Sequence, residues 1–302
     1  MVISSPTVDL VKSHTRRAVG LVLLCGILNS FGGLILRHID GSSEWQIVFF
    51  RSAALSLGLF FFFLARNGPR LAHNLRMVGV WGLVCGAFFG TMQTMFVLSL
   101  SNTTVANTAF ILSSGPILTA FLARLVLGER VGPATWVVLL AAVTGISLMV
   151  GDGLVTGSIL GDLAAVAGAF SFACFVVILR ARRTVDMVPS VITGGLMATV
   201  FAFLATGMDL AVPAHDAGLA VFWGGGLSAL VLLLFTFASR HLTGAVLTVL
   251  LMVEYFLGPF WVWVFLDETP SALALIGGAI VLTAVAAQAY LSALEPQRKR
   301  AG

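Results

Sequence analysis

Long apolar runs separated by short polar connections dominate the chain. A transmembrane helix needs about 20 apolar residues, because it rises about 1.5 Å per residue across a hydrocarbon core about 30 Å thick. Ten runs meet that length, and they cover residues 18–37, 45–65, 77–98, 103–124, 132–151, 158–179, 188–208, 217–239, 243–266 and 270–292. The pattern predicts an all-α integral membrane protein with ten transmembrane helices and no folded domain outside the bilayer.

The composition narrows the class further. Of the 302 residues, 59% are hydrophobic and 10% are charged, whereas an ordinary soluble domain has about 25% charged residues. This excludes a soluble enzyme, a disordered chain and a nucleic-acid-binding module. The three Cys residues lie singly in apolar runs, a spacing that predicts no disulfide and no zinc site. No metal and no cofactor are expected.

The positive charges are sorted along the chain. Nearly all of the 17 Lys and Arg residues fall in the two tails and in the connections after even-numbered spans, while acidic residues mostly occupy the other connections. By the positive-inside rule, both termini are cytoplasmic. We therefore expect a multi-pass protein of the inner (plasma) membrane, with cytoplasmic tails at residues 1–17 and 293–302.

Tryptophan positions fit the same arrangement. Four fall near the predicted outer ends of spans and two near the inner ends: Trp45, Trp223, Trp261 and Trp263, and Trp81 and Trp136. Tryptophan is enriched at both interfaces of a bilayer. The sequence thus predicts that these side chains anchor the bundle in the membrane.

The chain divides into two similar halves. The sequence Leu-Gly-Glu ending at Glu129 corresponds to Leu-Asp-Glu ending at Glu268. Glycine-rich stretches also recur at matching spans, at Gly82, Gly86 and Gly90 and at Gly224, Gly225 and Gly226. Since each half holds an odd number of spans, the unit at 152–292 should be inverted relative to the unit at 18–151. Inverted repeats are a common transporter design, with substrate held near the midplane.

Several motifs resemble those of a known family. They are Phe50-Arg51, Asn102-Thr103-Thr104 with Ala106 and Ala109 leading to Pro116, and Gly161-Asp162-Leu163 followed by Ala169-Phe170-Ser171-Phe172-Ala173 and Arg180. In this order the motifs resemble the EamA family of the drug/metabolite transporter superfamily. The second unit departs from the family at Tyr255, where Pro is often found, and at Asp267, where Gly is usual. The resemblance implies two five-helix units and an exporter of small metabolites, including amino acids, their derivatives or drugs.

Two charged residues lie inside predicted spans. Glu254 is the only acid deep within a span, where a charge costs about 2.5–3.5 kcal/mol on insertion scales. It is either a protonatable site that couples export to proton entry or a carboxyl hydrogen-bonded to neighbouring helices. Arg51 is either a clamp for the carboxylate of an anionic or zwitterionic substrate or a structural ion-pair or snorkelling residue. Whether the two side chains pair is open.

Further polar and helix-breaking residues complete the candidate site. The additional substrate-binding candidates are Asn29, Gln93, Asn107, Ser113, Ser114 and Tyr255. The candidate hinges are Gly115 with Pro116 and Gly258 with Pro259, because proline frees a backbone carbonyl and kinks a helix. The alternatives are interhelical hydrogen bonds for the polar residues and tolerated kinks for the prolines.

These features together predict a function. No predicted span contains His, and motifs such as H-E-x-x-H, G-x-S-x-G and the phosphate-binding G-x-x-x-x-G-K are missing from the sequence, so we expect no enzyme. The sequence favours a secondary transporter that exports small polar or amphipathic metabolites by alternating access, with protons as one candidate driving ion. An uncoupled facilitator or channel is the alternative. The chain is expected to bind its substrate within the lipid bilayer, as a monomer or a homodimer.

Overall fold

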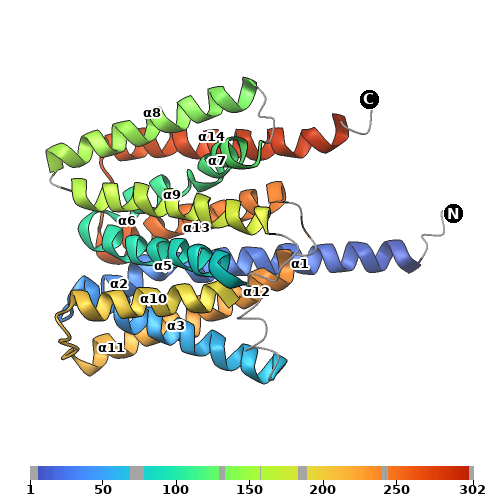
Figure 1. Cartoon of the computed structure of the whole chain (residues 1–302). Coiled ribbons are helices and arrows are strands. Elements are labelled where there is room, and N and C mark those ends of the chain that lie inside the picture. Colours follow the sequence, from blue (N-terminus) through green and yellow to red (C-terminus); the bar gives the residue numbers. More distant parts are fainter. Residues whose placement is uncertain are drawn as a thin grey trace.

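A computed structural model of the chain describes residues 6–68, 78–128, 133–156, 158–182, 189–239, 242 and 244–298. All regular elements within these ranges are helices, which run roughly side by side in one bundle (Figure 1). The predicted all-α class is confirmed. Glu129, on which the alignment of the two halves depends, lies outside the described residues.

Helices occur in all ten predicted ranges. Seven of the ranges each hold one helix: α3 (Glu44–Asn67), α5 (Gly79–Asn102), α8 (Pro133–Thr156), α9 (Ile159–Ala181), α10 (Pro189–Ala205), α13 (Gly244–Leu266) and α14 (Ala272–Arg298). The other three are divided into α1 (Pro6–Ser30) and α2 (Gly32–Leu36), α6 (Val105–Leu112) and α7 (Gly115–Leu127), and α11 (Ala214–Val221), the π-helix η1 (Phe222–Ser228) and α12 (Ala229–Ser239). These divisions are not apparent in the hydrophobic pattern.

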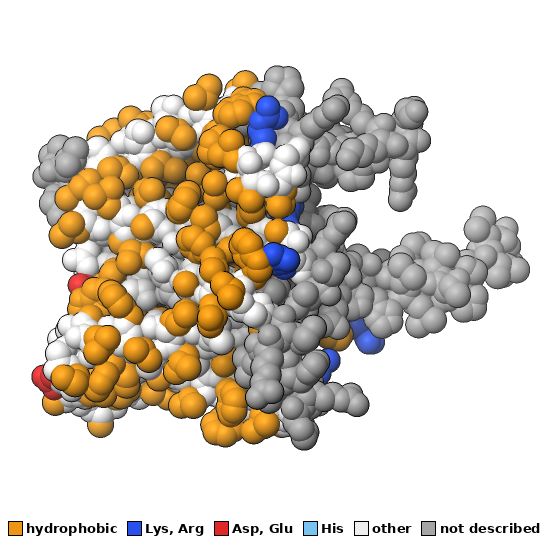
Figure 2. Space-filling model, viewed as in Figure 1, with side chains coloured by type: hydrophobic (Ala, Val, Ile, Leu, Met, Phe, Trp, Pro, Cys, Tyr) orange, Lys and Arg blue, Asp and Glu red, His pale blue; other side chains and the backbone are white. Residues whose placement is uncertain are grey.

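Apolar side chains cover the outer sides of the helices, as Figure 2 shows for one face of the bundle. Val80, Leu160 and Leu140 are 73%, 71% and 66% exposed. Among the described residues, six helical segments are long and apolar enough to cross a membrane, and four shorter apolar helices accompany them. A soluble monomer rarely exposes so much contiguous apolar surface, so the chain is a multi-pass membrane protein.

The two ends of the bundle differ in charge. Helix α1 begins and α14 ends at the same end (Figure 1), and the Lys and Arg side chains visible in Figure 2 gather there. We call the opposite end, which carries Glu44 and Glu268, the acidic end. This distribution agrees with the charge sorting in the sequence, while the cytoplasmic placement of the termini and the inversion of the halves stay predictions.

Glycines allow the closest helix contacts inside the bundle. A Cβ added to Gly194 on α10 would overlap the backbone of Gly86 on α5, and one on Gly90 would meet the carbonyl of Gly194. Small residues of this kind let membrane helices approach closely. Gly86 and Gly90 of α5 therefore serve packing within one chain. Helix α8 packs separately against α14 at one edge (Figure 1).

Candidate substrate site

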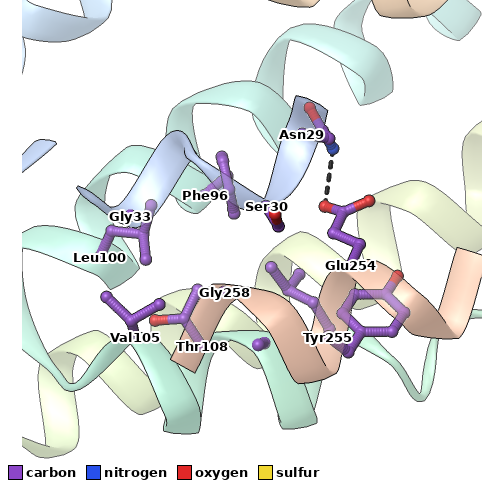
Figure 3. A pocket seen from close by; sticks show the side chains of 12 residues that line it. Asn29, Ser30, Gly33, Phe96, Leu100, Val105, Thr108, Glu254, Tyr255 and Gly258 are labelled. Carbon is purple, nitrogen blue, oxygen red and sulfur yellow. Dashed lines mark hydrogen bonds between the residues drawn. The ribbon is translucent and has the colours of Figure 1, made fainter. Parts of the chain in front are cut away.

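A small cavity lies inside the bundle (Figure 3). It is lined by α1 and α2 (Asn29, Ser30, Gly33), α5 (Phe96, Leu100), α6 (Val105, Thr108, Ala109, Leu112) and α13 (Glu254, Tyr255, Gly258). Its volume is about 30 Å³, whereas one water needs about 10–15 Å³. The cavity therefore has room for about two to three waters, and an amino acid enters only after the surrounding helices move.

Glu254 faces this cavity from α13. The Nδ2 atom of Asn29 on α1 donates a hydrogen bond of 2.6 Å to the Glu254 Oε1 atom (Figure 3). Helices α1 and α13 pack closely here, since a Cβ on Gly26 would lie 3.6 Å from the backbone nitrogen of Glu254. The half-buried carboxyl of Glu254 thus has a neutral polar partner from the other half of the chain. The bond is compatible with both roles considered for Glu254, structural and coupling.

A break in the first membrane segment shapes one wall of the cavity. Helix α1 ends at Ser30, and the Trp261 Nε1 atom of α13 donates to the Ser30 Oγ atom at 2.9 Å. The Phe31 ring stacks on Trp261 with centroids 5.2 Å apart. Beyond the break, a Cβ on Gly33 would meet the Val105 side chain. The break therefore brings α2 against α6, and Trp261 has an internal hydrogen-bond partner in addition to its predicted position near a span end.

Arg51 lies in a separate buried cluster. Arg51, on α3, is only 3% exposed, so its side chain does not snorkel to the surface. The guanidinium carbon lies 4.4 Å from the centre of the Trp223 ring and 5.7 Å from that of Phe96. When the side-chain amide of Gln93 is oriented with its oxygen toward Arg51, that oxygen accepts hydrogen bonds from both terminal nitrogens of Arg51 at 3.2 Å. Within the described ranges, Arg51 forms no ion pair, with Glu254 or with any other acid.

The π-helix η1 supplies the other side of the Arg51 cluster. It carries both Trp223 and Ser228, whose hydroxyl accepts from the Arg51 Nη2 atom at 3.5 Å. A Cβ on Gly224 would overlap the Arg51 carbonyl, so only glycine lets η1 lie this close to α3. Trp223 is 1% exposed. Its predicted place at the membrane interface is therefore wrong, because the ring covers a buried cation.

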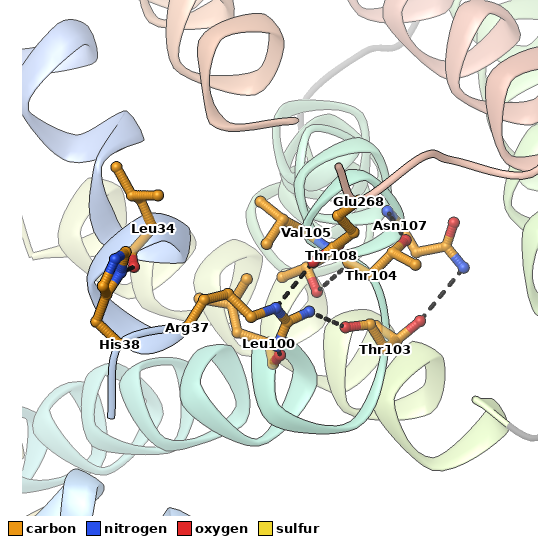
Figure 4. A network of polar contacts seen from close by, with 10 residues as sticks. All are labelled: Leu34, Arg37, His38, Leu100, Thr103, Thr104, Val105, Asn107, Thr108 and Glu268. Carbon is orange, nitrogen blue, oxygen red and sulfur yellow. Dashed lines mark hydrogen bonds and ion pairs between the residues drawn. The ribbon is translucent and has the colours of Figure 1, made fainter. Parts of the chain in front are cut away.

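A polar network closes the cavity toward the acidic end (Figure 4). The Arg37 Nε atom pairs with the Glu268 Oε2 atom at 2.8 Å, and its terminal nitrogens donate to the carbonyls of Leu100 at 2.6 Å and Thr103 at 2.9 Å. The Glu268 Oε1 atom accepts from the Val105 backbone nitrogen at 2.7 Å. Since Leu100 and Val105 also line the cavity, we call the Arg37–Glu268 pair the latch. The sequence singled out Glu268 only as the counterpart of Glu129 and did not reveal Arg37 as its partner.

Asn107 belongs to a neighbouring buried cluster and does not line the cavity. Asp162 on α9 is fully buried and accepts hydrogen bonds from Thr103 Oγ1 at 2.7 Å and Asn107 Nδ2 at 3.0 Å. The hydroxyl of Ser158 completes the set at 3.4 Å. In the sequence, Asp162 stood out only as part of the motif Gly161-Asp162-Leu163, which did not reveal this cluster. It ties α6 to α9 at the acidic end.

The remaining candidates lie at two proline sites. Ser113 and Ser114 are buried at the break between α6 and α7, and their hydroxyls donate to carbonyls of their own segment. They do not line the cavity. Gly115 and Pro116 begin α7, whereas Pro259 lies within the continuous helix α13, and Gly258 lines the cavity. Whether either site bends during transport stays a prediction.

The fold and the site define a class: a multi-pass membrane protein with a small internal cavity and buried polar side chains.

Residues 16–151 match the EamA-like transporter family, so the resemblance based on the motifs is confirmed. The chain is 24% identical over 283 residues to the pseudopaline exporter CntI of two Pseudomonas aeruginosa strains, UCBPP-PA14 and PAO1, covering 91% of this chain and 95% of each relative. A solved crystal structure shares the fold, with a TM-score of 0.61 and 18% identity over 91% of this chain and 98% of that one. These likenesses point to a transporter and not to an enzyme.

Proposed function

We propose that the chain is a secondary transporter that exports small polar or amphipathic metabolites across the inner membrane. The pseudopaline exporter CntI, in both strains, resembles it over nearly its whole length, which supports the direction of transport. The cavity lies between helices of both halves of the chain, which supports a substrate path between them. Alternating access moves the unit at 18–151 against the unit at 152–292.

The observation that carries the proposal is the position of the Glu254 side chain on the wall of the cavity. Its hydrogen bond with Asn29 joins the first half to the second at 2.6 Å. A hydrogen bond to a charged group contributes about 1.5–3 kcal/mol. Protonating Glu254, or offering it a substrate donor, changes that contribution at the contact between the two units. Glu254 is therefore the proposed coupling residue, with the proton as the driving ion.

The latch gives alternating access a defined barrier. The cavity is too small for a metabolite, and the Arg37–Glu268 pair holds α2, α5 and α6 together directly beside it. Release toward the acidic end requires these contacts to break. In this proposal, the arrangement described above is the one closed at that end.

Efflux from cells tests the proposal. Cells are loaded with labelled amino acids and amino-acid derivatives, and retention is compared with and without production of the chain. An exporter coupled to an ion lowers the internal concentration of a substrate below that of the medium. A facilitator, the alternative, stops when the two concentrations are equal. Equal retention with and without the chain for all labelled compounds would contradict the proposal.

A further inference from the structure

Among the residues that the structure describes, the guanidinium of Arg51 has no counter-ion. An arginine side chain stays charged in a protein, and a buried charge without a partner is costly. Its recorded neighbours are two aromatic rings, the amide of Gln93 and the hydroxyl of Ser228, all of them neutral. The buried Nε atom has no hydrogen-bond partner in the described structure. The cluster stabilises a cation and leaves one of its donors, the Nε–H group, unused.

The cluster is built by unusual backbone geometry. Trp223 and Ser228 both come from η1, a seven-residue π-helix, and π-helical turns in proteins frequently occur at functional sites. Gly224 lets η1 touch the backbone of Arg51. The guanidinium is therefore held at a fixed position by three elements, α3, α5 and η1, and does not depend on a flexible surface contact.

The cluster borders the cavity. Phe96 lines the cavity and lies beside the Arg51 guanidinium. A Cβ on Gly32 would meet the Trp223 ring at 3.1 Å, and the next residue, Gly33, lines the cavity. Phe96 thus contacts both the cavity that holds Glu254 and the cluster that holds Arg51.

We propose that Arg51 is the receptor for a carboxylate group of the exported metabolite. A carboxylate accepts two parallel hydrogen bonds from a guanidinium, and the unused Nε atom together with a terminal nitrogen offers that pair. A donor group elsewhere on the metabolite, such as an ammonium or a hydroxyl, binds Glu254 in the adjacent cavity. This inference rests on the proposed function and deepens it, because it restricts the substrates to carboxylates.

Ligand pairs that differ only in the carboxyl group test the inference. The full chain is purified in detergent, and its melting temperature is measured with leucine and leucinamide and with phenylalanine and phenylalaninamide. We expect each acid to bind at least about ten-fold more tightly than its amide, which is about 1.4 kcal/mol, and to raise the melting temperature accordingly. Equal effects of acid and amide, or no effect of either acid, would overturn the inference. This result is obtained with the wild-type protein alone.

Variants then assign the effect to Arg51. Arg51→Gln should remove the advantage of the acids while the response to the amides stays, and Arg51→Lys should keep part of it. Arg182→Gln is the matched control, since Arg182 also stacks on a tryptophan, Trp81, at 4.6 Å, but lies at the other end of the bundle. An Arg51→Gln protein that keeps its preference for the acids would refute the assignment.

The efflux assay separates this inference from the proposed function. If cells producing the chain export labelled compounds while acids give no advantage over amides, the exporter proposal stands and the carboxylate receptor fails. If the chain exports none of the labelled compounds, the exporter proposal fails as well.

Discussion

Replacing Glu268 with Gln should open the acidic end of the bundle. The carboxylate of Glu268 holds two partners at once, the Arg37 Nε atom at 2.8 Å and the Val105 backbone nitrogen at 2.7 Å. The amide of glutamine keeps one acceptor oxygen but loses the charge and the second acceptor. Arg37 then retains its bonds to the carbonyls of Leu100 and Thr103, so the latch weakens and does not disappear.

The size of the effect follows from the burial of the pair. The side chains of Arg37 and Glu268 are 26% and 20% exposed. Fully exposed pairs contribute about 0–1 kcal/mol, and hydrogen bonds to charged groups about 1.5–3 kcal/mol. The Arg37–Glu268 pair is partly buried, and glutamine keeps one of the two acceptor oxygens. We therefore expect the substitution to cost an intermediate amount, about 1–2 kcal/mol. That corresponds to a roughly 5–30-fold shift toward the open arrangement.

Cysteine labelling measures this shift. A cysteine replaces Ala109, which lines the cavity, in a chain whose three natural cysteines have been removed. Membrane-impermeant maleimide is added from the side of the acidic end, and the labelling rate should rise roughly 5–30-fold in Glu268→Gln. Glu44→Gln is the control, because Glu44 accepts from Asn102 at 2.7 Å and does not touch the latch. Unchanged labelling in Glu268→Gln, or an equal rise in Glu44→Gln, would refute the reasoning.

Three other substitutions test the packing and polar contacts. Asn29→Leu leaves Glu254 without its donor and should cost about 1–3 kcal/mol at the cavity wall, seen as a loss of efflux from a protein that still inserts in the membrane. Asp162→Asn should lower stability by about 1–3 kcal/mol, measured by thermal unfolding, since Asp162 is buried with three donors; an unchanged melting temperature would contradict this. Gly194→Val should prevent α10 from packing on α5 and reduce the yield of folded protein, while Gly20→Ala, with no atom within 4 Å of the added Cβ, should have little effect.

The positions of the helices could be predicted from the sequence because they depend on local properties. A run of about 20 apolar residues satisfies its backbone hydrogen bonds within itself and buries its side chains in lipid wherever it occurs. The ten predicted ranges therefore correspond to helices. The breaks at Phe31 and within 222–228 were not predicted, because they are stabilised by contacts with distant residues, Trp261 and Arg51.

The candidate site was predictable only in part for the same reason. A charged residue inside an apolar run is conspicuous, so Glu254 and Arg51 could be selected by position alone. Their partners could not, because Asn29 and Glu254 are 225 positions apart in the chain. Trp223 shows the limit most clearly, since a tryptophan near the end of a span suits the membrane interface and the protein interior equally well, and only the packing of η1 on α3 decides between them.

Transport by proteoliposomes under an imposed pH gradient tests the central proposal most directly. Counterflow of labelled amino acids is measured for the wild type, for Glu254→Gln and for the control Glu44→Gln. If Glu254 couples export to protons, flux by the wild type and the control follows the gradient, and flux by Glu254→Gln does not. Equal fluxes in all three proteins, indifferent to the gradient, would contradict the account and identify an uncoupled facilitator in which Glu254 is structural.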